Sequence, residues 1–261
     1  MILALIASRN VQLSVMAQYF SSSAQRDSVF KRMQRFLKQV TLPDNQIATL
    51  ILAILGFEKD EKLTLIFDRT NWKFGKIHLN ILFLCIVHRG ASVPIFFTFL
   101  TDKKQGNSSY VDRIDLMEKF IALLGRTRIY CVLGDREFCG KRWIIWLRKK
   151  KIPFVMRLSE KKTKVANNDD DFIRAHDLFA NLKKGRKRSL GYSLIGESDS
   201  FKACISALRT HKNELVVVIH SEDIKNPLSY YKKRWKIESM FKIMKTGGFN
   251  LENTHVCIVG Q

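Results

Sequence analysis

Long apolar runs are missing from this chain of 261 residues. The two longest, Met1–Ala7 and Ile81–Val87, fall far short of the roughly 18 apolar residues that a membrane-spanning helix needs. The N-terminus has no basic segment before its apolar run and no clear small-residue cleavage site. The sequence therefore argues against an integral membrane protein and against a secretory signal.

Paired cysteines and zinc-binding spacings are also lacking. No two cysteines form a C-x-x-C pair, and no histidines have the H-E-x-x-H spacing of a helical zinc site. We expect neither a disulfide framework nor zinc, and we expect the cysteines to be small buried hydrophobes in a reducing cytoplasm. The five cysteines, an odd number, are Cys85, Cys131, Cys139, Cys204 and Cys257.

Acidic residues are scarce relative to basic ones. Aspartate and glutamate number 24 against 45 lysines and arginines, which gives a net charge of +21 and a pI near 9.9. Such an excess is usually neutralised by a polyanion, and nucleic acid is the first candidate. A membrane surface is the second, but no basic amphipathic helix dominates the chain. Hydrophobic residues, at 46%, suffice for the core of one large domain or two small ones.

The first 60 residues predict a small helical region with a basic face. One helix is expected after Ser21–Ser23, with one of these serines as its cap, and a second from Thr41 to Gly56. This region is either a DNA end-binding module or an ordinary bundle with a solvated basic face. The apolar positions are Val29, Met33, Phe36 and Leu37, then Ile47, Leu50, Ile51 and Ile54; the basic ones are Arg26, Lys31, Arg32, Arg35 and Lys38.

Residues 61–261 have the pattern of an α/β domain with a mixed sheet flanked by helices. Apolar runs rich in Ile, Phe and Val predict strands, and helical periodicity predicts the helices between them. In chain order we expect strands at Leu63–Phe67, His78–His88 and Ser92–Leu100, a polar turn at Asp102–Asn107, a helix at Val111–Leu124, a strand at Ile129–Leu133, a helix at Phe138–Lys150 and a strand at Pro153–Leu158.

The stretch 159–213 interrupts this alternation and is predicted to be a mostly β insertion. It is polar and charged, and only Leu190–Ile195 and Phe201–Leu208 have the character of strands. An apolar strand, Glu214–His220, follows it. A long helix is then expected over 224–246, before the glycine pair Gly247-Gly248.

Asp68 and Asp135 occupy matched positions, each after an apolar strand. Carboxylates at the ends of adjacent strands project into the crevice where α/β proteins bind ligands. Two such groups repel each other unless a cation or a proton intervenes, and Mg²⁺ suits this role because it prefers carboxylate and phosphate oxygens. Taken singly, each aspartate is more often a turn residue or a helix cap, so the pattern alone leaves both roles open.

The last predicted helix carries four polar residues on one face. Arg234, Glu238 and Lys245 follow Tyr231 by 3, 7 and 14 residues. At about 100° per residue, the four fall within an arc of roughly 60°. Helix geometry alone also allows an exposed polar face with local ion pairs such as Arg234–Glu238. The neighbouring apolar stripe, which would pack on the sheet, consists of Ile237, Phe241 and Met244.

These four residues reproduce the block Y-x2-R-x3-E-x6-K without a gap, and the block resembles the signature of the IS4-family DDE transposases. The segments Asp68-Arg69-Thr70-Asn71-Trp72 and Gly134-Asp135-Arg136-Glu137-Phe138 are similar to that family's contexts for its first two catalytic aspartates. Three motifs in the right order are far more specific than any one of them. The resemblance implies an RNase H-like catalytic core interrupted by the β-rich insertion.

The resemblance also implies a chemistry and its partners. Asp68, Asp135 and Glu238 would be the catalytic triad and would hold two Mg²⁺ or Mn²⁺ ions, roughly 3.5–4 Å apart, for DNA cleavage and strand transfer. Tyr231, Arg234 and Lys245 would bind phosphates near the cut end. The implied partners are double-stranded DNA, both as terminal inverted repeats and as target, and a second copy of the chain in a homodimer. The expected location is the bacterial cytoplasm, at the nucleoid.

Two departures from the family pattern leave alternatives open. The family normally continues with further helices, whereas only residues 246–261 follow Lys245. A truncated, inactive DNA-binding fragment that inhibits full-length transposase is therefore the main alternative, and a stand-alone RNase H-like nuclease is the third. The insertion also contains no tryptophan for stacking a flipped base in a DNA hairpin; Tyr192 or Phe201 would have to substitute, although we expect each in a core.

Overall fold

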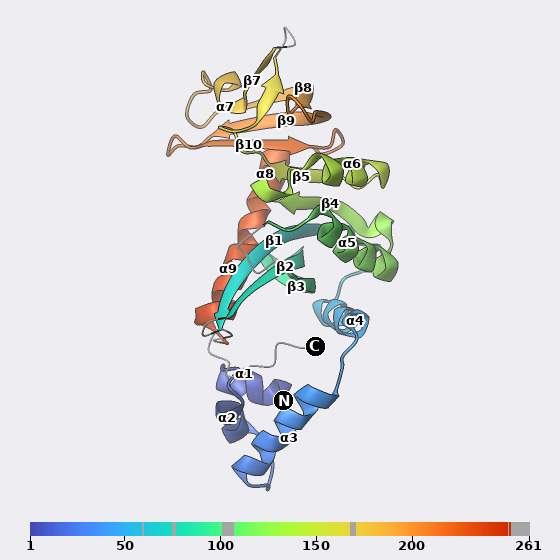
Figure 1. The fold of residues 1–261 in the computed structure, drawn as a ribbon, viewed down its shortest axis with the longest axis vertical. Helices are drawn as coiled ribbons and strands as arrows, with labels where there is room; N and C mark the ends of the chain where they lie inside the picture. Colours follow the sequence, from blue (N-terminus) through green and yellow to red (C-terminus); the bar gives the residue numbers. More distant parts are fainter. Residues whose placement is uncertain (59, 75–76, 101–106, 168–170, 250, 252–261) are drawn as a thin grey trace.

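A single mixed β-sheet forms the centre of the protein. The computed structural model describes residues 1–58, 60–74, 77–100, 107–167, 171–249 and 251. Helices cover both faces of the first half of the sheet, and a small group of helices lies at one end of the molecule (Figure 1). Most of the predicted turn at Asp102–Asn107 and Cys257 lie outside the described residues.

In the described part of the chain, the sheet has ten strands in the order β3-β2-β1-β4-β5-β10-β9-β8-β6-β7. Strand β2 is antiparallel to its two neighbours, β1 and β3. Strands β4 and β5 continue the sheet parallel to β1, and the remaining pairs are antiparallel. The strands are β1 (Leu63–Phe74), β2 (Ile77–His88), β3 (Ala91–Leu100), β4 (Ile129–Gly134), β5 (Phe154–Arg157), β6 (Lys164–Ala166), β7 (Phe172–Arg174), β8 (Lys187–Ile195), β9 (Phe201–Arg209) and β10 (Leu215–His220).

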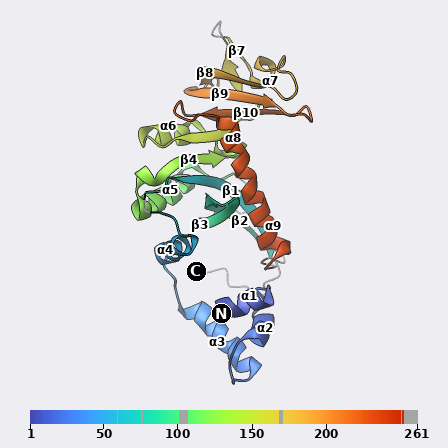
Figure 2. The same cartoon turned by 180° about the vertical axis from the view of Figure 1, so that it is seen from behind.

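Helices from different parts of the chain cover the two faces of β1–β5. Helices α5 (Tyr110–Leu124) and α6 (Lys141–Lys149) pack on one face, and α8 (Pro227–Tyr231) and α9 (Lys236–Lys242) lie on the other (Figures 1 and 2). The α/β class with a mixed sheet flanked by helices, as expected for an RNase H-like core, is confirmed.

Side chains along β1 alternate between two cores, because successive residues of a strand point to opposite faces. Leu65 and Phe67 are buried in the core beneath α5 and α6, whereas Ile66 is buried in the core beneath α8 and α9. This alternation places Asp68 on the same face as Ile66, and Arg69 on the face of Phe67.

The predicted insertion extends the sheet instead of standing apart from it. Strand β9 pairs with β10 from Cys204 to Arg209, and β8 pairs with β9 along most of its length. Both strands are longer than predicted: β8 starts at Lys187 instead of Leu190, and β9 ends at Arg209 instead of Leu208. A short helix, α7 (Ala175–Leu178), lies between β7 and β8.

The N-terminal helices divide between two cores. The first three helices pack around a small cluster of Leu13, Met16, Ala17, Val29 and Met33, whereas Ala48 of α4 is buried in the core beneath α5 and α6. A division of the chain near residue 60 stays a prediction. The elements are α1 (Ile2–Ser8), α2 (Leu13–Met16), the 3₁₀ turn η1 (Ala17–Tyr19), α3 (Arg26–Gln39) and α4 (Asp44–Leu55).

Several local predictions in this region are wrong. Helix α3 begins at Arg26 after Gln25, so no serine of Ser21–Ser23 caps it. Phe36 and Leu37 are exposed, because α3 buries only the side that carries Val29 and Met33. In α4, Ile51 packs against the core, while three other members of the predicted stripe face outwards: Ile47, Leu50 and Ile54. Helical periodicity identifies the apolar positions, whereas tertiary contacts determine which of them are buried.

Other boundaries also differ from the prediction. The predicted helix at Phe138–Lys150 is divided into a 3₁₀ turn, η3 (Arg136–Phe138), and α6, because Gly140 lies between them with extended backbone. A second 3₁₀ turn, η2 (Arg126–Arg128), leads into β4. Helix α5 begins one residue early, at Tyr110, where Ser109 and Asp112 form a capping box.

The described helices and cysteines can be compared with the sequence predictions. Among the described residues, none of the helices combines the length and apolar character of a membrane span. Cys85, Cys131 and Cys204 are buried as free thiols, and Cys139 is a partly buried free thiol that donates to the backbone oxygen of Arg157. These four described cysteines therefore behave as small core residues.

Candidate active site

Asp68 and Asp135 are brought together by the parallel pairing of β1 with β4. Ile66 lies opposite Leu133 in this pair, and each aspartate follows two residues later. Both side chains therefore belong to the face of the sheet that α8 and α9 cover. The prediction that Asp68 ends its strand is wrong, because β1 continues to Phe74 through its pairing with β2. What ends just before Asp68 is the pairing with β4.

Gly134 allows the turn that carries Asp135 to lie close to its neighbours. A Cβ atom at this position would come within 2.7 Å of the Met156 sulfur and 2.8 Å of the Phe138 Cβ. Both neighbours are fully buried, and the Phe138 Cβ can move only with its own backbone. Glycine is therefore required here, since any side chain would push the start of the Asp135 turn away from the sheet.

The C-terminal helical segment runs from Pro227 to Gly247, but it is not one regular α-helix. Between α8 and α9 lies a 3₁₀ turn, η4 (Lys232–Trp235), and a π-helical turn, η5 (Ile243–Gly247), follows α9. The predicted continuous helix is thus locally wrong, and a constant 100° per residue only approximates it. In 3₁₀ geometry, residues three apart lie directly above one another, which aligns Tyr231 with Arg234.

The apolar side of this segment packs on the sheet as predicted. Ile237 is fully buried, and Phe241 and Met244 pack against the same core. Tyr231 and Arg234 are also buried, so the segment does not present the simple exposed polar face that helix geometry alone allowed.

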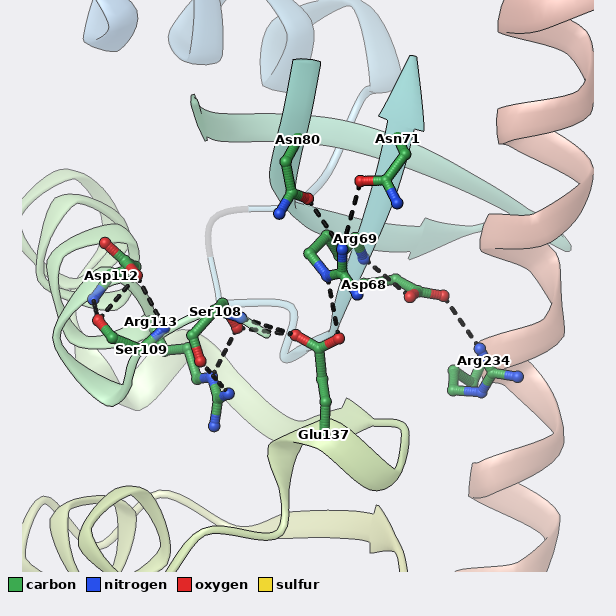
Figure 3. A network of polar contacts seen from close by, with 10 residues as sticks. All are labelled: Asp68, Arg69, Asn71, Asn80, Ser108, Ser109, Asp112, Arg113, Glu137 and Arg234. Atoms are coloured by element: carbon green, nitrogen blue, oxygen red, sulfur yellow. Dashed lines mark hydrogen bonds and ion pairs between the residues drawn. The ribbon is translucent and has the colours of Figure 1, made fainter. Parts of the chain in front are cut away.

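Arg234 and Tyr231 connect the C-terminal helical segment to Asp68 and Asp135, which lie far away in the chain. Arg234 Nη1 donates to Asp68 Oδ2 (3.0 Å), its Nη2 to Glu238 Oε1 (2.7 Å) and its Nε to the Tyr231 hydroxyl oxygen (3.1 Å). The Tyr231 hydroxyl in turn donates to Asp135 Oδ1 (3.3 Å). Figure 3 shows Arg234 reaching from the helix towards Asp68 on β1. The structure therefore links all three predicted catalytic carboxylates through two side chains of the same helical segment.

The members of this group differ in their exposure to solvent. The Arg234 side chain is 5% exposed, whereas that of Glu238 is 59% exposed. The i,i+4 ion pair foreseen as an alternative does form, but Arg234 also reaches Asp68. Lys245, the last residue of the predicted block, donates from Nζ to the backbone oxygen of Asn71 (2.8 Å), three residues beyond Asp68 on β1.

Burial controls the ionisation of this group. Desolvation raises the pKa of Asp68 to about 6, against the lowering effects of the Arg69 backbone N–H and of Arg234. Burial also raises the pKa of Tyr231 to about 12, so its hydroxyl stays neutral and able to donate. For Arg234, burial works to lower the pKa, but Tyr231, Asp135 and Asp68 together raise it, so the guanidinium stays charged.

Asp68 should make the ion-free protein less stable as the pH rises from about 4 to about 6. In this window the folded state keeps a proton on Asp68 that the unfolded state has lost, so the free energy of unfolding falls with pH. Over this window, the free energy of unfolding of wild type should fall by up to about 3 kcal/mol relative to that of Asp68→Asn. Urea unfolding of both proteins across this range, without divalent ions, would measure it. Parallel curves would contradict the expectation, and the exposed Asp199→Asn variant should follow wild type.

A second polar network lies behind the two aspartates, and sequence reasoning missed it. Arg69 donates from Nε to Glu137 Oε2 (3.1 Å), and Glu137 Oε1 accepts from the Ser108 hydroxyl (2.8 Å). Arg113 of α5 donates from Nε to Ser108 Oγ (2.9 Å). Arg69 and Glu137 stand in the two motifs around Asp68 and Asp135, so their opposite charges were a usable signal.

The three carboxylates lie within a region that a comparison with known families identifies. A family model described as a transposase DDE domain matches residues 60–257, from just before β1 to beyond the C-terminal helical segment. The comparison with curated proteins found no match. Since the matched region covers well over half of the chain and contains all three carboxylates, the chain belongs to the transposase DDE domain family.

Proposed function

We propose that this chain is a DNA transposase of the IS4 type, which cleaves and joins strands at the ends of an insertion sequence. Asp68, Asp135 and Glu238 are its catalytic residues and the ligands of two Mg²⁺ or Mn²⁺ ions. The observation that carries the proposal is the convergence of these carboxylates on Arg234 and Tyr231. Membership of the transposase DDE domain family supports DNA transposition in general.

The residues suit divalent ions in their chemistry. Carboxylate oxygens are the donors that Mg²⁺ prefers, and a buried carboxylate such as Asp68 is costly to ionise without a nearby cation. As the side chains stand, no three Asp, Glu, His or Cys residues in the described parts of the chain are grouped to hold an ion. The Arg234 guanidinium lies between Asp68 and Glu238 instead, so ion binding requires Arg234 to shift.

Each side chain has a proposed task in the reaction. When bound, the ions would supply the charge that activates a water or a 3′-hydroxyl and stabilises the leaving oxygen. Asp68 and Asp135 are held by the sheet, whereas Glu238 is more exposed and is able to adjust from the helix. A guanidinium that leaves the carboxylates finds an equivalent partner in a phosphate, so Arg234, with Tyr231 and Lys245, would hold DNA near the cut end.

The positive charge of the chain suits double-stranded DNA as the partner. The basic residues of α3 are exposed along the helix, while Val29 and Met33 anchor its other side. We propose that residues 1–60 contact the inverted repeats and that two copies of the chain act together in the active complex. Phosphate contacts of this kind position a protein on DNA, and they weaken as salt is added.

The proposal predicts metal-dependent nicking at inverted repeats. The full chain is incubated with Mg²⁺ or Mn²⁺ and with labelled DNA that carries the repeats flanking its own reading frame. Nicks at the repeat ends, absent when the repeats are scrambled, would support a transposase. Salt-sensitive binding without any cutting would instead favour the inhibitory fragment. Cutting that ignores the repeats would favour a stand-alone nuclease.

A further inference from the structure

We infer that Glu137 is a positioning residue: through its ion pair with Arg69, it keeps Asp68 and Asp135 at a fixed separation. The inference rests on the proposed function, since it concerns the same carboxylates. It adds a residue that does not touch the ions or the DNA.

The need for such a residue arises where the sheet pairing stops. Strands β1 and β4 are paired up to Ile66 and Leu133, two residues before the aspartates. Beyond this point β1 stays paired with β2, whereas the chain after Gly134 turns into η3. The backbone hydrogen bonds that fix the spacing of the two strands therefore end just before the residues whose spacing matters.

The Arg69–Glu137 ion pair spans this gap. Arg69 follows Asp68 by one residue and Glu137 follows Asp135 by two, so the pair joins the two motifs directly. Their side chains are only 16% and 15% exposed, and Arg69 Nε lies 3.1 Å from Glu137 Oε2. A shielded pair of this kind is strongly coupled, because little water competes with it and losing one partner leaves the other charge unpaired.

The same arginine reaches Asp68 through its backbone. The Arg69 N–H donates to Asp68 Oδ1 (2.8 Å), while the Arg69 side chain points to the opposite face of the sheet. There its Nη1 donates to Asn80 Oδ1 (3.0 Å) and to Asn71 Oδ1 (3.3 Å), as Figure 3 shows. Anchoring the Arg69 side chain thus fixes the N–H group that orients the Asp68 carboxylate.

Glu137 is itself held from the other side. Its Oε1 accepts from the Ser108 hydroxyl (2.8 Å) and from the Ser108 N–H (3.3 Å), at the start of α5. Arg113 holds Ser108 through both its hydroxyl and its backbone oxygen. Both oxygens of Glu137 are therefore engaged away from the face that carries Asp68 and Asp135, so its function is to support these residues.

Glu137→Gln removes the charge while keeping the size of the side chain. Outer residues that orient metal ligands typically affect metal affinity by roughly 10- to 100-fold. We expect this variant to bind Mn²⁺ that much more weakly and to need correspondingly more Mg²⁺ for half-maximal nicking. DNA affinity should not change. Arg69→Gln should behave alike, and the double variant should be no worse than either single one, because the two residues act as one unit.

The decisive experiment is Mn²⁺ binding by the full chain, followed by electron paramagnetic resonance, for wild type and these variants. Glu160→Gln is the control, since Glu160 is similarly buried and pairs with Arg136, which is not part of the Arg69–Glu137 ion pair. Loss of folded protein would lower the number of sites per chain, whereas loss of positioning lowers the affinity of each. If Glu137→Gln binds Mn²⁺ with wild-type affinity while Glu238→Gln binds it more weakly, the inference about Glu137 is wrong and the proposed function is unaffected. If wild type shows no saturable Mn²⁺ binding, both the inference and the proposed function are wrong.

Discussion

Glu238→Gln is expected to lower Mg²⁺-dependent nicking by roughly 10³-fold or more, a loss of about 4 kcal/mol in transition-state stabilisation. The substitution keeps the shape of the side chain and its capacity to accept from Arg234 Nη2. It removes the negative charge that a divalent ion requires. Asp68→Asn and Asp135→Asn should have effects of the same size, because all three carboxylates belong to one proposed site.

The chain offers a closely matched control in Glu197→Gln. The Glu197 side chain is 57% exposed and pairs with Lys164 (2.6 Å), much as the 59% exposed Glu238 pairs with Arg234 (2.7 Å). The two glutamates thus differ mainly in location, and Glu197→Gln should nick at the wild-type rate. DNA binding should survive in all these variants and is measured separately by fluorescence anisotropy. Undiminished nicking by Glu238→Gln would show that the carboxylate assignment is wrong.

The order of strands and helices could be predicted because each element carries its own periodicity. Apolar runs located β2, β4 and β10 to within a residue or two, and Gly125 and Gly56 marked helix ends correctly. The alternation of Leu65, Ile66 and Phe67 between two cores shows why the face of Asp68 was also accessible to reasoning. The local sequence pattern is sufficient to predict an element whose conformation depends on residues close to it in the chain.

The remaining features depend on partners far away in the chain. Strand β1 extends beyond Asp68 because β2 pairs with it. Phe36 stays exposed, although its position in the helical repeat predicts burial. Arg69 and Glu137 are 68 positions apart, so their opposite charges within the two motifs suggest a pair, but only the fold brings them into contact. The same is true of Arg234: the local pair with Glu238 was foreseeable, whereas the contact with Asp68 needed the fold.

Arg234→Gln should destabilise the ion-free protein by about 3 kcal/mol, because it leaves the buried Asp68 carboxylate without its counter-charge. The guanidinium occupies the space between Asp68 and Glu238 that a divalent ion would need. Under the proposed function, an ion displaces Arg234 in wild type, and part of its binding energy is spent on breaking these contacts. In the variant no such competition exists, so Mn²⁺ should bind at least about tenfold more tightly and restore much of the lost stability.

Calorimetric unfolding with and without Mn²⁺ tests this expectation, with Arg209→Gln as the matched control. Arg209 is a partly buried arginine whose guanidinium donates to the backbone oxygens of Leu182 and Phe179, and no carboxylate is among these partners. Its loss should lower the melting temperature without changing the response to Mn²⁺. A larger Mn²⁺-induced rise in Arg234→Gln than in wild type would mean that the cation and the guanidinium compete for the same carboxylates. Equal rises in the two proteins would mean that Arg234 lies beside the ion site and does not occupy it.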